Sequence, residues 1–142
     1  MKEHLEAIIR KSVAGAAWHG PSVGESIAGL DAETANWRAG SSHTIHELVL
    51  HVAAWMDEAA ERMYGRNHDD PLPGNFPTPA DWQHSQQVLA DSMEKLIAAV
   101  RTSSADTHFE LLVGVAQHNA YHAGQIVTLR KMVSRHAEHQ SD

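Results

Sequence analysis

A proline- and glycine-rich break, residues 65–77, divides a chain that is otherwise patterned for helices. It contains Pro71, Pro73 and Pro77, so it cannot be helical. On both sides of it apolar residues recur at spacings of three and four, and alternating strand-like runs are lacking. Neighbouring antiparallel helices are usually joined by only about 2–8 residues. The break is longer than that, and when fully extended it could span about 43 Å. The helix before it is roughly 30 Å long. The helix after the break is therefore predicted to run parallel to the one before it.

Capping patterns predict where the helices begin and end. Thr44 and Glu47 form a capping box, so one helix is expected over Thr44–Tyr64, ending at Gly65. The other expected elements are a helix over residues 2–14, a shorter helical piece near 21–30 starting at Gly20-Pro21, a helix over 79–101 capped by Thr78-Pro79, and a helix over 108–135 preceded by a second capping box, Thr107–Glu110. These elements predict an all-α fold, a four-helix bundle with one long crossover.

Length and composition narrow the classes of protein. The 142 residues suit one domain, expected over 1–142. The absence of cysteine excludes disulfides, thiolate metal sites and a cysteine nucleophile. With 11 Lys and Arg against 18 Asp and Glu, the net charge of −7 argues against a nucleic-acid partner. The charged N-terminus does not resemble a signal peptide, so a cytoplasmic location is expected. Residues 111–129 carry no formal charge, but their polar side chains favour a buried bundle helix over a membrane span.

Histidine placement is the most informative feature for function. The chain has 12 histidines, and His118 and His122 lie one turn apart on an otherwise apolar helical stripe. His51 lies on the edge of the apolar stripe of the Thr44–Tyr64 helix. His51 is roughly 20 Å from the C-terminal end of its helix, and the other two are roughly 16–22 Å from the N-terminal end of theirs. If these helices are antiparallel, the three rings lie at one level.

Three neutral histidines without a fourth protein ligand would form an open metal site. Imidazole suits zinc, nickel or iron(II), and the open position could hold water or a substrate thiol. The alternative is that the rings are packed core histidines bonded to the backbone or to amide side chains. His43 and His46, at a helix start, are expected to face solvent, while His19 could approach the site. Trp55 is expected to be a core anchor or a pocket wall.

Two segments carry a resemblance to a known family. Residues 43–55 (HTIHELVLHVAAW) and residues 117–126 (QHNAYHAGQI) are similar to the DinB/YfiT-like family of metalloenzymes. The likeness extends over most of the chain, including residues 18–22 and the proline-rich crossover. The His-x-x-x-His-x-Gly-Gln block is its most specific part.

The resemblance implies an up-down-down-up bundle that is often dimeric, so a homodimer is expected. It implies a divalent metal held by His51, His118 and His122, the residues that the stripe argument selects. Several relatives with known activity are transferases or isomerases that use low-molecular-weight thiols. Asn119, Tyr121 and Gln125 are candidates for aligning the ligands. Position 46 is often aromatic in this subgroup, so His46 is a candidate wall or extra polar contact of the pocket.

Three functions remain open at this point. The leading hypothesis is a metal-dependent thiol-S-transferase that acts on a small-molecule substrate, with zinc or nickel favoured and iron an alternative. The second is a hydrolase in which a metal-bound hydroxide takes the place of the thiol. The third is a non-catalytic bundle that binds a small ligand or a partner. The sequence identifies no general base.

Overall fold

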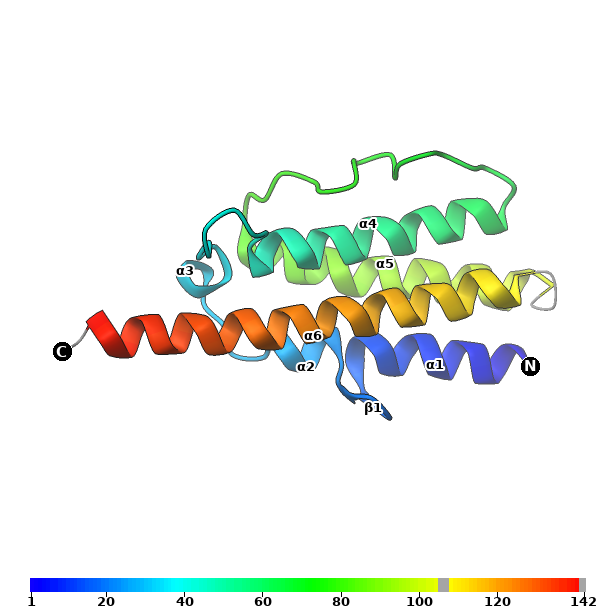
Figure 1. The fold of residues 1–142 in the computed structure, drawn as a ribbon. Coiled ribbons are helices and arrows are strands. Elements are labelled where there is room, and N and C mark those ends of the chain that lie inside the picture. Colours follow the sequence, from blue (N-terminus) through cyan, green and yellow to red (C-terminus); the bar gives the residue numbers. More distant parts are fainter. Residues whose placement is uncertain (105–107, 141–142) are drawn as a thin grey trace.

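The computed structural model describes residues 1–104 and 108–140 and contains four long helices. They are α1 (Lys2–Ala14), α4 (Ile45–Met63), α5 (Trp82–Thr102) and α6 (Phe109–Gln140). In Figure 1, α1 and α6 run in one direction and α4 and α5 run in the other. This confirms the predicted all-α bundle with up-down-down-up topology. It also places α4 antiparallel to α6, as the site prediction requires.

The crossover after α4 runs back along the outer face of that helix before α5 begins (Figure 1). Gly65 has a φ of 81°, and its left-handed backbone lets the next amide, that of Arg66, bond the carbonyl oxygen of Glu61 at 2.9 Å. The predicted end of α4 at Gly65 is therefore confirmed. Near the start of the crossover, the Nδ1 atom of His68 lies 2.6 Å from the buried carboxylate of Glu58. That contact ties the departing chain back to α4.

The start of α5 differs from the prediction. The pair Thr78-Pro79 does not begin the helix, which starts at Trp82 with Asp81 as its cap. A carboxylate oxygen of Asp81 accepts the amide of His84 at 2.8 Å. The indole of Trp82 donates to the carbonyl oxygen of Leu30 at 2.9 Å, which anchors the helix start on the chain segment before α4. A carboxylate cap and this tertiary contact outweigh the proline signal.

The short connection between α1 and α4 also differs in detail. A single helical piece near 21–30 was expected, but the chain forms α2 (Val23–Ile27) and α3 (Ala32–Ala35). Ser22, rather than Gly20-Pro21, caps α2. Between α1 and α2 lies a small antiparallel ladder, β1 (Ala16–Ala17) with β2 (Gly20–Pro21). Elements this short carry too few residues for a periodic signal.

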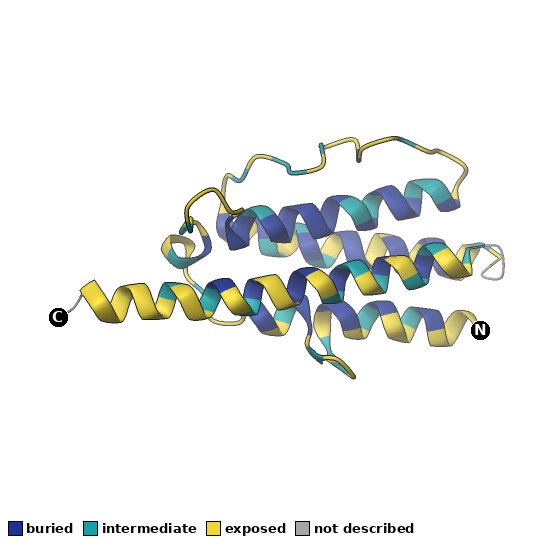
Figure 2. Ribbon diagram, viewed as in Figure 1, coloured by how far each residue is buried: buried dark blue, intermediate teal, exposed yellow. Residues whose placement is uncertain are grey.

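Helix α6 is longer than predicted and continues to Gln140, beyond the ends of the other helices (Figure 1). Its last turns are exposed, whereas α4 is the most buried helix of the bundle (Figure 2). Thr107, the expected cap of α6, lies outside the described residues. No helix in the described part of the chain is both long and apolar enough to cross a membrane.

Candidate metal centre

The side chain of His51 is supplied by α4, whose start is fixed by a capping box. The hydroxyl of Thr44 accepts the amide of Glu47 at 3.1 Å, and the carboxylate of Glu47 accepts the amide of Thr44 at 3.1 Å. This confirms the predicted cap at the start of α4. About two turns further on, His51 is buried on the side of α4 that faces α6.

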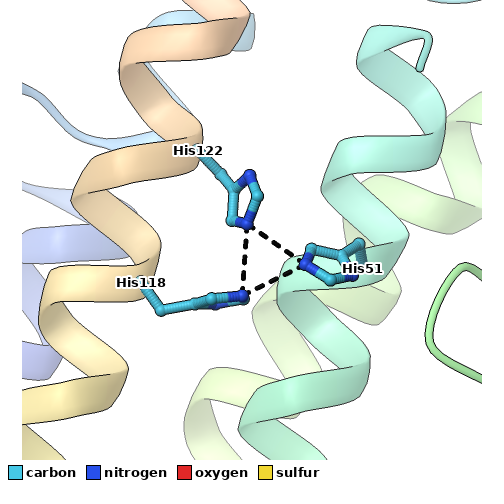
Figure 3. A group of neighbouring side chains, drawn as sticks. All are labelled: His51, His118 and His122. Carbon is cyan, nitrogen blue, oxygen red and sulfur yellow. Dashed lines mark hydrogen bonds between the residues drawn. The ribbon is translucent and has the colours of Figure 1, made fainter. Parts of the chain in front are cut away.

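The other two rings come from α6, one turn apart, and all three meet between the helices (Figure 3). The Nε2 atom of His51 is 3.1 Å from the Nε2 atoms of both His118 and His122. The Nε2 atoms of His118 and His122 are 3.2 Å apart. The three rings therefore converge, as the helical rise per residue predicted for antiparallel helices. In the described residues, no Asp or Glu joins this group.

The hydrogen bonds of the outer ring nitrogens decide which lone pairs face the centre. Nδ1 of His51 donates to the main-chain carbonyl oxygen of Asn75 at 2.6 Å. Nδ1 of His122 donates to Oε1 of Gln125 at 2.6 Å. A neutral imidazole carries one proton, so the Nε2 atoms of both rings present lone pairs to each other. No proton is available to form a hydrogen bond between these two nitrogens. A cation shared by both lone pairs suits such a contact.

The spacing of the three nitrogens fits metal coordination. Four-coordinate zinc with bonds of about 2.0–2.1 Å requires ligand nitrogens about 3.3–3.4 Å apart. An octahedral ion with the same bond lengths requires about 2.8–3.0 Å between adjacent nitrogens. The observed 3.1–3.2 Å lies between these values. The three-histidine group can therefore hold a metal ion of either geometry, with positions left for other ligands.

Burial keeps the rings in the protonation state that a metal needs. It lowers the pKa of His51 and of His122 below the usual value. Burial, followed by the proximity of His122 and His51, lowers the pKa of His118 to about 4. Neutral imidazole is the ligand form, so all three rings are ready to bind a cation at neutral pH.

The crossover forms one wall of the site, a role that the sequence analysis did not foresee. The ring of Phe76 is sandwiched between two histidines, at a centroid distance of 4.2 Å from His51 and 3.7 Å from His43. Both pairs are stacked with an interplanar angle of 9°. Besides its carbonyl bond to His51, Asn75 accepts the indole N–H of Trp55 on its side-chain oxygen at 2.8 Å. Asn75 and Phe76 therefore hold the ring of His51 and the neighbouring indole of Trp55 together.

Of the three residues proposed to align the ligands, Gln125 is the one that is hydrogen-bonded to a converging ring, that of His122. Asn119 does not: it is fully buried on the α1 side of α6, where its amide donates to the hydroxyl of Ser12 at 3.0 Å. Tyr121 is 66% exposed, and its ring meets His122 edge-on at a centroid distance of 5.0 Å. Spacing along α6 could not separate these three, since each lies within three residues of a ligand.

The remaining candidates divide between the site and other parts of the fold. Trp55 is next to the site, with its ring centroid 6.3 Å from that of His118. His19 is exposed, its Nε2 atom lies 3.3 Å from the carbonyl oxygen of Pro21, and it is not part of the three-histidine group. His43 is exposed as expected, although it stacks on Phe76.

The expectation that His46 faces solvent is wrong. Its side chain is fully buried, with Nδ1 donating to the side-chain oxygen of Asn36 at 3.1 Å. Its Nε2 atom accepts the hydroxyl of Ser85 at 2.7 Å. Both nitrogens are thus satisfied by partners on other elements, and His46 joins α4 to α5 rather than lining the metal centre.

Comparison with known families agrees with this arrangement. The family model of the DinB superfamily matches residues 23–126, well over half of the chain. The chain belongs to the DinB superfamily. The matched region contains all three converging histidines, the crossover and Gln125, so the DinB-like part of the chain is the part that builds the site. No curated protein and no solved structure matched the chain.

Proposed function

We propose that this DinB-like protein is a metal-dependent enzyme whose metal is held by His51, His118 and His122, and that it transfers a thiol to an electrophilic small molecule. The observation that carries the proposal is the contact between the Nε2 atoms of His51 and His122, which face each other without a proton to share. A divalent ion held by these three residues would supply a positive charge that lowers the pKa of a thiol and favours the thiolate.

The chain's own groups orient the ligands and shape the space around them. Gln125 and the carbonyl of Asn75 fix the ring planes of His122 and His51. Phe76 covers the outer face of His51 and excludes water from it. In the transfer, the thiol proton passes to solvent and a bond forms from sulfur to the electrophilic carbon. The bond from that carbon to its leaving group breaks, and the leaving group takes the electron pair.

Two features favour a thiol over water as the nucleophile. A thiol has a pKa of about 8.5 and is deprotonated by metal binding alone. Water starts near 15.7, and its attack on a carbonyl or phosphoryl group generally benefits from a positioned base. In the described residues no carboxylate lies among the three nitrogens to serve as that base. The DinB/YfiT-like resemblance points to low-molecular-weight thiols for the same position.

The test is elemental analysis of untagged protein beside two double variants. His118→Ala/His122→Ala removes two proposed ligands, and His136→Ala/His139→Ala removes two exposed histidines from the same helix. We expect about one zinc, nickel or iron per chain in the wild type and in the exposed-pair control, and none in the ligand variant. Absence of metal from the wild type after reconstitution would overturn the metal site.

A thiol titration of the cobalt-substituted protein separates the two enzyme classes. We expect a low-molecular-weight thiol such as glutathione to change the visible cobalt spectrum with saturation. The same titration of the metal-free protein supplies the blank. A spectrum that stays unchanged at saturating thiol would overturn thiol transfer and leave hydrolysis as the function of a metal-loaded site.

A further inference from the structure

A cavity of about 240 Å³ lies between α4 and α6, with His118 in its wall. One side is formed by Trp55, Glu58, Ala59 and Arg62 of α4, and the other by residues of α6 between Glu110 and His118. An apolar cavity of about 150 Å³ is large enough for benzene. This space therefore suits a molecule somewhat larger than benzene, in contact with one of the converging rings.

Gly114, in the α6 wall, has no role in the backbone or in helix packing. Glycine inside a helix costs about 1 kcal/mol relative to alanine. The residue does not have a positive φ, and a Cβ built on it meets no atom within 4 Å. Close approach of a neighbouring helix does not explain the glycine. What its missing side chain leaves is room in the cavity.

The charged groups at the cavity are already paired with each other. The carboxylate of Glu58 accepts Nε of Arg62 at 2.7 Å and lies 2.6 Å from Nδ1 of His68. Although burial opposes it, these hydrogen bonds lower the pKa of Glu58 and keep it ionised. The guanidinium of Arg62 lies over the ring of Trp55, 5.7 Å from its centroid. The wall therefore offers aromatic and aliphatic surface rather than an unpaired charge.

The other carboxylate of the cavity, Glu110, is exposed at its edge. A carboxylate at this position disfavours ligands with negative charge. The polar body of a common cofactor thiol does not match such a lining, whereas an uncharged apolar group does. Of the two reactants of a thiol transfer, the lining of this cavity therefore suits the electrophilic substrate and not the cofactor thiol.

We infer that this cavity binds the apolar body of the electrophilic substrate, a small uncharged aryl or branched alkyl group, and that Gly114 sets the size of the group admitted. The assignment of the ligand as an electrophile rests on the proposed function. The binding of an apolar group does not rest on the proposed function, because the cavity is formed by the protein itself, without a metal. The two can therefore be tested separately.

The test uses toluene as the apolar probe and benzoate as its charged counterpart, added to metal-free full-length protein. Binding is followed by amide chemical shifts in NMR spectra. We expect toluene to bind with a Kd of about 1 mM or below, with the largest shift changes at Gly114, Val115 and Ala59. We expect benzoate to bind at least roughly tenfold more weakly.

Variants at two glycines of the same helix give the matched comparison. Gly114→Leu fills the cavity and should weaken toluene binding by roughly tenfold or more. Gly124→Leu should leave toluene binding unchanged, because Gly124 also faces open space but lies outside this cavity. Both should melt no lower than the wild type, since each replaces a helical glycine.

Two results would overturn the inference: no toluene binding to the wild type, or equal binding to Gly114→Leu. Failure of the metal proposal has a different signature. A protein that binds no metal but binds toluene in a manner dependent on Gly114 would keep the cavity as an apolar ligand site. A protein that binds metal but not toluene would lose the cavity assignment alone.

Discussion

The main-chain carbonyl oxygen of Asn75 lies 2.6 Å from Nδ1 of His51, so a residue of the crossover sets the orientation of a ring on α4. Hydrogen bonds of this kind fix the tautomer of a ligating histidine and raise its basicity. The carbonyl cannot be removed by substitution, but the position of the segment that carries it depends on Phe76, which is stacked on His51. The crossover is therefore part of the site as well as a connection.

Replacing Phe76 tests this role. Phe76→Ala removes the stack on His51 and loosens the Asn75 carbonyl, so we expect metal affinity to fall by about 10–100-fold. Competition with a chromophoric chelator measures the change. Leu72→Ala, an exposed position in the same segment, is the control and should bind metal like the wild type. Wild-type affinity in Phe76→Ala would show that the crossover does not position the ring.

Gln125 should orient His122 through its side-chain oxygen. Gln125→Ala removes the acceptor for Nδ1 of His122, and we expect about a 10–100-fold loss of metal affinity. Gln125→Glu keeps an acceptor at that place and should restore most of the affinity. Gln117→Ala, exposed on the same helix, provides the background value. If Gln125→Ala and Gln117→Ala bind metal equally, the amide has no such role.

Metal binding should stabilise the fold. An ion that binds only the folded chain at 100 times its Kd raises the free energy of unfolding by about 2.7 kcal/mol. We expect thermal scans to show a higher Tm with zinc or nickel than with a chelator, and no difference in His118→Ala/His122→Ala. A chelator that strips the ion without lowering the Tm would contradict this expectation.

Stability of the metal-free protein should fall as the pH drops below about 6.5. Burial lowers the pKa of His46 below its usual value, despite the nearby carboxylates of Asp81 and Glu47. The unfolded chain therefore takes up a proton on His46 at a higher pH than the folded chain does. Below the unfolded pKa, this group removes at most about 1.4 kcal/mol of stability per pH unit until the folded pKa is reached.

Urea unfolding of metal-free protein at pH 7.5 and pH 5 measures that dependence. We expect the wild type to lose more stability between the two values than His46→Gln, which cannot take up a proton. His84→Gln, at an exposed position on α5, should lose as much as the wild type. Equal losses in wild type and His46→Gln would mean that His46 titrates alike in both states.

Local patterns were enough to predict that His51, His118 and His122 lie close together. The capping box at Thr44 predicted where α4 starts, and the four-residue spacing of His118 and His122 put both rings on one side of α6. The length of the crossover was compatible with an antiparallel arrangement of α4 and α6, which the structure shows. Each of these signals acts within one element or through chain length, which is why sequence reasoning could combine them into a common level for the three histidines.

The features that escaped prediction depend on contacts between distant segments. The bond from His51 to Asn75 uses a main-chain carbonyl, which every residue possesses and which leaves no sequence signature. His46 is buried because Asn36 and Ser85 supply partners from other elements. Asn119, by contrast, lies close to the ligands in sequence but is rotated toward α1, where Ser12 accepts its amide proton.

The chain distance between the converging rings has a consequence for folding and synthesis. His51 and His118 are separated by 67 positions, and the crossover and all of α5 lie between them. During translation the ring of His51 emerges first, and no pair with it can form until the first third of α6 has left the ribosome. Capture of a metal between α4 and α6 would therefore follow the synthesis of α5. An ion bound there would close a long loop, and it would restrict the conformational freedom of the middle of the protein as a cross-link between distant positions does.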